Sequence, residues 1–219
     1  MENEIVTVLD IETTGLDPHT DHITEIAAIR AEVGPGGYIR EIGRFQTYVA
    51  LPDVNGEAVE IPEFITELTG IKAEDLRGAP SVWSAIGALL AFVGEAAVIA
   101  HNIPFDLRFI AANHPLGDVI TYPHGFACTR AMSRLIDPDE NASLAPTCER
   151  YGIALNGHHR AMNDVEATLQ LYAVLKEKAE VNGITYRNVV VDSPERPLTY
   201  TPPGAIVRTI ERKQTKEVA

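Results

Sequence analysis

Cysteine is scarce in this sequence: the only two, Cys128 and Cys148, lie far apart and form no CxxC pair. Such spacing predicts neither a disulfide framework nor a zinc site. We therefore expect two reduced, structural thiols in a cytoplasmic protein.

Long apolar runs are missing as well. The longest, residues 86–100, is interrupted by Glu95 and is too short to span a bilayer. The first residues, MENEIVTVLD, carry neither the basic start nor the apolar stretch of a secretory signal. We expect a globular chain with no membrane partner.

Positive charge is in short supply, because 31 acidic residues outnumber 18 Lys and Arg and the formal net charge is −13. This sign argues against broad, salt-dependent binding of duplex DNA. The segment from residue 194 onward is the exception at +2, and the remainder therefore carries −15. This segment contains three acidic residues, Glu195, Glu211 and Glu217. Its five basic residues are Arg196, Arg208, Arg212, Lys213 and Lys216.

Strand and helix patterns occupy most of the 219 residues, which suffice for a real core. Alternating apolar residues and short connections predict an antiparallel meander of strands at about 4–11, 23–33 and 38–49. Helical spacing then predicts further elements, with Ser81 as an N-cap and Gly70 as a C-cap. These are helices within 62–70, 81–94, 104–113, 127–136, 143–152 and 163–180, and a buried strand at 96–102. The fold class is therefore α/β, a mixed sheet flanked by helices.

The chain changes character after residue 183, where β-type runs alternate with Pro-rich turns. We expect residues 1–183 to form the main domain. Residues 184–219 are expected to be a C-terminal appendage with a β-hairpin and a flexible basic end.

The stretch VLDIETTGLD, residues 8–17, ends an apolar strand with two acids, Asp10 and Glu12. Side chains of a strand alternate between faces, so these carboxylates project on the same side. Two such carboxylates repel each other unless a cation lies between them. A strand that merely runs into a polar turn is the alternative for this stretch alone.

A second acid, Asp106, lies in AHNIPFDLRF, residues 100–109. A buried strand ends at His101, Asn102 is expected to cap the next helix, and Pro104 is tolerated in its first turn. Asp106 then lies near the helix N-terminus, where the macrodipole favours an anion. Its alternative role is to complete the helix start.

The third acid, Asp164, opens a long helix in GHHRAMNDVEATLQLYAVL, residues 157–175. His159 lies five residues earlier in a glycine-containing loop, which can bring its imidazole beside the helix start. Taken alone, a loop histidine is usually solvated, and His158 competes with it.

Four carboxylates at strand ends or helix starts, with one loop histidine, are the set of side chains that a two-metal phosphodiesterase needs. Mg²⁺ prefers hard oxygen ligands, and two such ions roughly 4 Å apart can activate water and stabilise a leaving oxygen. A histidine can accept the proton of that water. Metal binding would explain why Asp10 and Glu12 lie together.

Three motifs, DIETTG, HNIPFD and HHRAMND, resemble in order and separation those of the DEDDh exonucleases. These are the DnaQ-like 3′–5′ exonucleases, which include the proofreading subunits of bacterial replicative DNA polymerases. The resemblance covers about residues 5–180 and implies an RNase H-like fold. It also implies two divalent ions, Mg²⁺ or Mn²⁺, bound by Asp10, Glu12, Asp106 and Asp164.

The same resemblance assigns the general base and a substrate pocket. The H-x4-D spacing selects His159 over His158 as the base. Residues implied to line the pocket of the terminal nucleotide are Thr13, Thr14, Gly15, Leu16, Thr69, His101, Asn102 and Phe105.

The implied reaction releases nucleoside monophosphates from single-stranded or frayed DNA 3′ ends. RNA is the alternative substrate, because the motifs do not reveal how the pocket treats the 2′-OH. A non-catalytic module that binds nucleic acid or a polymerase would be expected to lack one of the five catalytic residues, and all five are present. An unrelated α/β domain with scattered acids is the last alternative.

Proofreading would require a polymerase partner, and residues 184–219 are the candidate contact. The same segment could instead dimerise the protein, guide the DNA strand or pack on the core. The oligomeric state is therefore left open.

Overall fold

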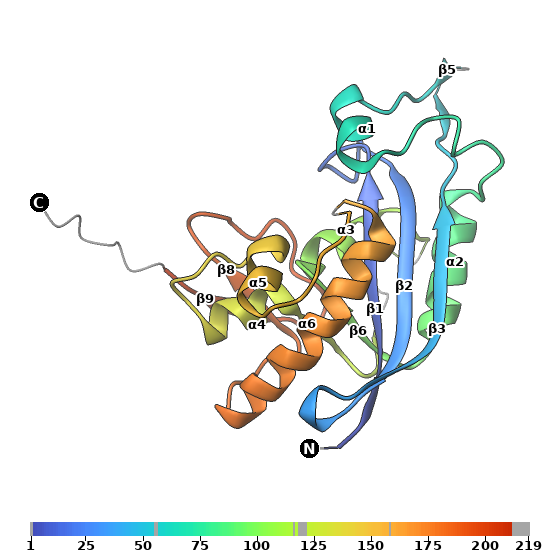
Figure 1. Ribbon diagram of the computed structural model, residues 1–219. Coiled ribbons are helices and arrows are strands. Elements are labelled where there is room, and N and C mark those ends of the chain that lie inside the picture. Colours follow the sequence, from blue (N-terminus) through green and yellow to red (C-terminus); the bar gives the residue numbers. More distant parts are fainter. Residues whose placement is uncertain (1, 55–56, 116, 118–121, 158, 212–219) are drawn as a thin grey trace, which may run out of the picture.

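A five-stranded sheet with strand order β3-β2-β1-β6-β7 forms the centre of the molecule (Figure 1). The computed structural model describes residues 2–54, 57–115, 117, 122–157 and 159–211. The strands of this sheet are β1 (Glu4–Thr13), β2 (Ile23–Val33), β3 (Ile39–Tyr48), β6 (Ala97–Ala100) and β7 (Phe126–Cys128).

The sheet combines both strand orientations. β1, β2 and β3 pair antiparallel, whereas β6 pairs parallel with β1 and with β7. This arrangement confirms the predicted mixed sheet. β7 itself was not predicted, because a buried run of three residues shows no alternation, and the helix expected at 127–136 begins after it.

The described residues form six α-helices, as the sequence predicts, and all but α1 belong to the main body around the sheet. They are α1 (Glu63–Thr69), α2 (Val82–Val93), α3 (Ile103–Ala112), α4 (Thr129–Ile136), α5 (Leu144–Arg150) and α6 (Ala161–Val181). Ser81 caps α2 by accepting a hydrogen bond from the Ser84 N–H at 3.4 Å, and Gly70 ends α1 with a φ of 72°. The capping role expected of Asn102 is wrong: it precedes α3 in the left-handed region, and its side chain forms no capping hydrogen bond.

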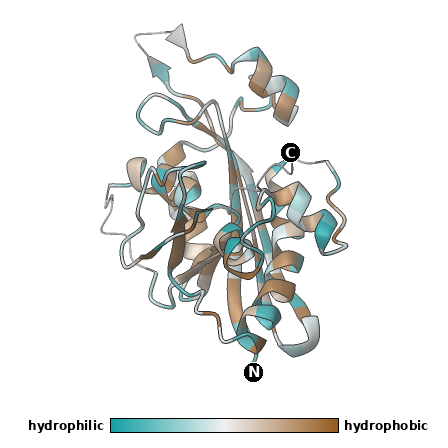
Figure 2. Cartoon of the chain, turned by 90° about the vertical axis from the view of Figure 1, so that its left-hand side faces the viewer, coloured by the Kyte–Doolittle hydropathy of each residue, from teal (hydrophilic) through white to brown (hydrophobic). Residues whose placement is uncertain are grey.

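The sheet separates two cores, and β1 contributes to both. Val6 and Val8 pack in the core beneath α6, whereas Leu9 and Ile11 pack with α2 and α3 on the opposite face. Figure 2, in which apolar residues are brown, shows the strands enclosed between helices. Alternation along one strand therefore decides which core each residue enters.

The C-terminal segment packs on the domain through β8 (Val189–Asp192) and β9 (Ile206–Thr209). These strands pair parallel, so the expected β-hairpin is wrong. A hairpin joins antiparallel strands by a short turn, whereas parallel strands need a longer connection that crosses back to the same end. The Pro-rich chain between β8 and β9 is this connection, because it runs from the end of β8 back to the level of its start. The three valines of β8 are at most 6% exposed and belong to the core. The expected flexible end, residues 212–219, lies outside the described residues, and the domain boundary at 183 stays a prediction.

A smaller projection lies beyond the C-terminal end of β1 (Figure 1). It consists of α1 and the short pair β4 (Asp53–Val54) and β5 (Glu57–Ala58). Within the described part of the chain, no helix has both the length and the hydropathy that a membrane span requires.

Candidate active site

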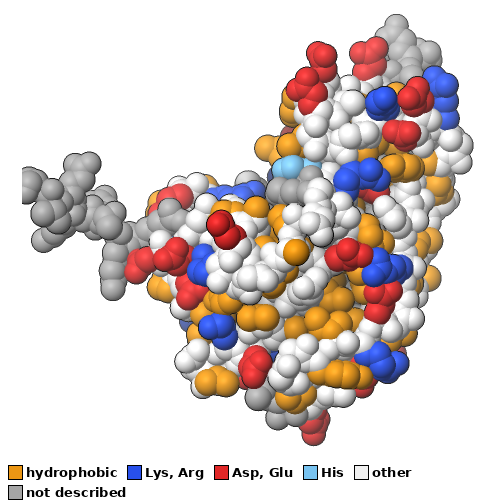
Figure 3. All heavy atoms as spheres, in the orientation of Figure 1, with side chains coloured by type: hydrophobic (Ala, Val, Ile, Leu, Met, Phe, Trp, Pro, Cys, Tyr) orange, Lys and Arg blue, Asp and Glu red, His pale blue; other side chains and the backbone are white. Residues whose placement is uncertain are grey.

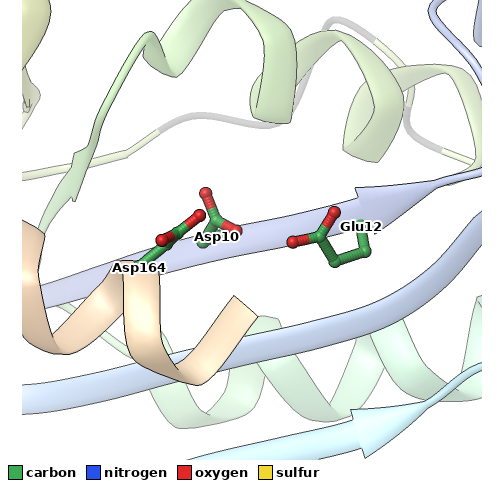
Figure 4. Close-up of side chains that lie close together, drawn as sticks. All are labelled: Asp10, Glu12 and Asp164. Atoms are coloured by element: carbon green, nitrogen blue, oxygen red, sulfur yellow. The ribbon is translucent and has the colours of Figure 1, made fainter. Parts of the chain in front are cut away.

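Three carboxylates meet where β1 passes under the start of α6. Asp10, Glu12 and Asp164 each offer an oxygen atom, and these atoms all lie within 4.8 Å of one another. Figure 4 shows Asp10 and Glu12 projecting from β1 and Asp164 reaching them from the first turn of α6. Asp10 and Glu12 continue the row of Val6 and Val8, so alternation directs them to the α6 face.

Asp106 approaches the same end of β1 from the first turn of α3, with 2% of its surface exposed. The pairing of β1 with β6 covers only Val6 to Val8. Farther along β1, the backbone N–H of Ile11 donates a hydrogen bond to the Asp106 carboxylate instead. Asp106 is not one of the three carboxylates within 4.8 Å, but its charge acts on Asp10.

The pKa values report how unfavourable this arrangement is for bare carboxylates. Burial raises the pKa of Asp10 well above its usual range, and Asp106, Glu12 and Asp164 raise it further. Burial, followed by repulsion from Asp164 and Glu25, raises the pKa of Glu12 to about 8. Burial also raises the pKa of Asp106, although backbone N–H groups partly oppose the shift. Hard oxygen donors that repel one another in a desolvated site fit divalent cations of the Mg²⁺ type.

His159 lies in the loop directly before α6, half-buried and with a φ of 69°. Its backbone N–H donates a hydrogen bond to Oδ2 of Asp164 at 3.3 Å, which ties the loop to the carboxylate cluster. His158 lies outside the described residues. The assignment of His159 as general base stays a prediction.

Glu25 is a site-adjacent residue that the sequence analysis missed. It is 1% exposed on β2 and lies directly opposite Glu12 in the strand register. Its carboxylate accepts hydrogen bonds from Arg160 Nε and Nη2 at 3.4 and 3.3 Å, and from the Ala161 N–H at 3.3 Å. Glu25 thereby joins the sheet to the residues that follow His159. The sequence feature that could have indicated this role is a single acid within the otherwise apolar strand ITEIAAI, residues 23–29.

Thr13, Thr14 and Gly15 build the turn that follows β1. The Thr13 hydroxyl donates to the Gly15 carbonyl at 2.5 Å, and the Thr14 hydroxyl accepts from the His22 N–H at 2.9 Å. A Cβ at Gly15 would lie 2.5 Å from the Asp21 carboxylate, so a larger residue here would displace that side chain. The hydroxyl groups are used within the turn, and contact with substrate stays a prediction.

Leu16, Asn102 and Phe105, which are also predicted to bind substrate, line one cavity of about 330 Å³. Leu16 is 77% exposed at this place. Phe105 is anchored against Phe109, with 5.0 Å between the ring centroids.

Two further predicted residues have structural partners. The Thr69 hydroxyl donates to the Ile65 carbonyl at 2.9 Å and accepts from the Ile71 N–H, closing α1. His101 Nδ1 lies 2.9 Å from the Thr129 hydroxyl. These contacts hold α1 to the following chain and β6 to the start of α4.

Comparison with known proteins gives a family and a fold. The model of the exonuclease family matches residues 7–172. The chain is 34% identical to the PolC-type DNA polymerase III of Bacillus subtilis over 190 residues, which is 86% of this chain and 12% of the polymerase. The Clostridium perfringens polymerase of the same type is 32% identical over 187 residues, covering 83% of this chain. The chain thus spans 12% of the length of these two relatives.

Solved exonuclease structures share the architecture. E. coli exonuclease I in complex with a dT13 oligonucleotide has a TM-score of 0.65 at 18% identity, over 82% of this chain and 42% of that one. Exonuclease X in complex with 5′ overhanging duplex DNA has a TM-score of 0.59 at 22% identity, over 83% of this chain and 95% of that one. These likenesses confirm the expected RNase H-like fold.

Proposed function

Because this chain belongs to the exonuclease family, we propose that it removes nucleotides from DNA 3′ ends in a metal-dependent reaction of the DEDDh type. The meeting of Asp10, Glu12 and Asp164 within 4.8 Å carries this proposal. DNA is favoured over RNA because the matched relatives are DNA polymerases and both compared exonucleases were solved with DNA. The expected substrate is a single-stranded or frayed end.

The metal ligands proposed are Asp10, Glu12 and Asp164, with Asp106 as the fourth acid. Their oxygen atoms suit two Mg²⁺ or Mn²⁺ ions, whose positive charge would relieve the repulsion described above. Such ions, when bound, make water a stronger nucleophile and stabilise charge on a leaving oxygen.

His159 is the proposed general base. It would accept a proton from the water that attacks the terminal phosphodiester, while its main-chain bond to Asp164 fixes the loop beside the acids. The bond between phosphorus and the 3′ oxygen of the penultimate nucleotide breaks. A nucleoside 5′-monophosphate is released, and the leaving 3′ oxygen takes up a proton from water to become the 3′ hydroxyl of the shortened strand.

Proofreading beside a polymerase is the proposed cellular role. It rests on the similarity to PolC-type polymerases, of which this chain corresponds to 12% of the length.

A ladder assay tests the activity. DNA and RNA of one sequence, each labelled at the 5′ end, would be incubated with protein and Mg²⁺ or Mn²⁺. We expect metal-dependent shortening from the 3′ end, faster for DNA, and none with EDTA or with Asp10→Ala. Glu41→Ala, on the exposed side of β3, is the matched control. Undiminished digestion by Asp10→Ala would contradict the metal site, and faster shortening of RNA would make RNA the substrate.

Variants of the two adjacent histidines test the base. We expect His159→Ala to lower kcat by about 100-fold or more and to remove the pH dependence that its ionisation imposes. His158→Ala is the matched control and should retain most of the activity. A His159→Ala enzyme with near-normal kcat and a merely shifted pH profile would exclude the assignment.

A further inference from the structure

The cavity that contains Leu16, Asn102 and Phe105 is also lined by three arginines, Arg108, Arg130 and Arg196. We call it the arginine pocket. Its wall joins the start of α3, the start of α4 and the C-terminal segment after β8. In Figure 3 the surface is hollowed between the part that carries α1 and the part that carries α4 to α6, and blue basic side chains lie on both parts.

One acid, Glu195, lines the arginine pocket itself and another, Asp17, lies beside it, and each has an arginine partner. Asp17 pairs with Arg108 at 3.2 Å, and Glu195 pairs with Arg134 at 3.5 Å. Arg134 is 4% exposed, so Glu195 compensates a buried charge that lies outside the lining.

Arg130 and Arg196 have no ion-pair partner among the residues that the structure describes. Burial, and after it repulsion from Arg196, lowers the pKa of Arg130. Arg130 also lies in the first turn of α4, where the helix dipole disfavours a cation. Two guanidinium groups are therefore held together in an unfavourable position, in a protein with a net charge of −13.

An anion bound between these groups would remove the repulsion. Phosphate is a suitable anion, because guanidinium groups present paired donors that match its oxygen atoms. The pocket shares Leu16, Asn102 and Phe105 with the predicted wall of the terminal-nucleotide site, so a strand bound there passes directly beside it.

We propose that the arginine pocket binds a backbone phosphate of the substrate strand, upstream of its 3′-terminal nucleotide. This inference rests on the proposed function. The C-terminal segment then contributes Arg196 to DNA binding, in addition to packing on the core. No metal ligand takes part, so the subsite would affect substrate binding and leave bond cleavage unchanged.

Kinetics on two substrates tests the subsite. A single-stranded oligonucleotide has upstream phosphates, whereas the p-nitrophenyl ester of thymidine 5′-monophosphate has none. For Arg130→Gln and Arg196→Gln we expect KM on the oligonucleotide to rise about tenfold, with kcat unchanged. Both constants on the ester should stay within twofold of wild type. Arg40→Gln, an exposed arginine of β3 that pairs with Glu32, is the control.

Salt dependence and chemical substitution of the DNA locate the phosphate. The slope of log affinity against log salt should become shallower by about 0.7 in the double variant. Replacing backbone phosphates one at a time by neutral methylphosphonates should weaken wild-type binding at one upstream position. The same replacement should have little effect in the double variant. A sensitive position found only in a complementary strand would overturn the assignment to the substrate strand.

Other outcomes would also overturn the proposal. These are an unchanged KM on the oligonucleotide in both variants, or an equal loss on the ester, which would indicate a distorted active site. Loss of binding to an acidic protein partner with DNA binding intact would identify a different ligand. If Arg130→Gln does not fold, Arg130→Lys and the exposed Arg196→Gln keep the test decisive. If wild type cleaves neither substrate, the proposed function fails, and anisotropy with labelled single-stranded DNA still tests the pocket.

Discussion

At the scale of the residue, Glu12 makes the metal-free protein sensitive to pH. Its pKa is raised from 4.5 to about 8, so the folded state holds the proton more tightly than the unfolded state. Below pH 4.5 Glu12 is protonated in both the folded and the unfolded state, so its raised pKa does not lower the free energy of unfolding there. The free energy of unfolding should therefore fall between pH 4.5 and 8, by a few kcal/mol, since Glu12 is partly exposed.

The corresponding variant is Glu12→Gln. In EDTA at pH 8 we expect it to unfold at a higher urea concentration than wild type, with a smaller difference at pH 5. Mg²⁺ should stabilise wild type more than the variant. Equal urea midpoints at pH 8 would show that the raised pKa has no effect on folding.

Glu25 supports a second prediction at this scale. In Glu25→Gln the side chain keeps its size but loses the charge that holds Arg160, so the loop containing His159 should be less well positioned. We expect kcat to fall about tenfold or more with little change in KM. Glu32→Gln, a change to a partly exposed residue on the same strand, is the control. An equal loss in both variants, or a rise in KM alone, would argue against a positioning role.

Strand alternation and helix starts are local properties, so the sequence could indicate where the acids lie, while their role as metal ligands stays a prediction. Asp10, Glu12 and Asp164 converge as expected. The partnership of Glu25 with Arg160 could not be predicted, because it joins residues 135 positions apart in the chain. The arginine pocket was missed for the same reason.

At the scale of the element, β8 is the feature that the sequence described least well. Pro-rich turns on either side of short apolar runs indicate a hairpin when only local spacing is considered. The strands pair parallel, and the valines of β8 enter the core against β7 and α4. The three-residue strand β7 was not predicted, because its residues are all buried and show no alternation. Its pairing with β6 is what makes it a strand.

Removal of the segment after residue 183 is therefore expected to destabilise the whole domain. The three valines of β8 would be lost from the core, and each contributes roughly 1.5–3 kcal/mol. Their sum approaches the total stability of a typical domain, about 5–15 kcal/mol. Urea denaturation should show a much lower midpoint than for a chain that ends at Glu211. Equal midpoints would show that β8 is dispensable.

At the scale of the whole molecule, electrostatics govern the encounter with DNA. A net charge of −13 and four carboxylates at the site repel phosphates until cations compensate them. We expect Ca²⁺ to raise the affinity for single-stranded DNA by about tenfold or more over EDTA. The Asp10→Asn variant should need Ca²⁺ less.

Fluorescence anisotropy with a labelled oligonucleotide that carries a non-hydrolysable 3′ end would measure this effect. Glu32→Gln, which leaves the carboxylate cluster intact, should respond to Ca²⁺ as wild type does. The same affinity in EDTA and in Ca²⁺ would mean that the carboxylates do not face the bound strand.

The alternation of β1 also has a consequence for how the protein can change over generations. Leu9 and Ile11 face the core, so selection for cellular abundance alone would retain them. The same selection would readily discard Asp10 and Glu12, because removing mutually repelling acids stabilises the fold. In a screen of all substitutions in β1, changes at Leu9 and Ile11 should therefore lower the protein level. Changes at Asp10 and Glu12, the positions between and after them, should lower activity. Only lineages that continue to use the reaction would keep both pairs of residues.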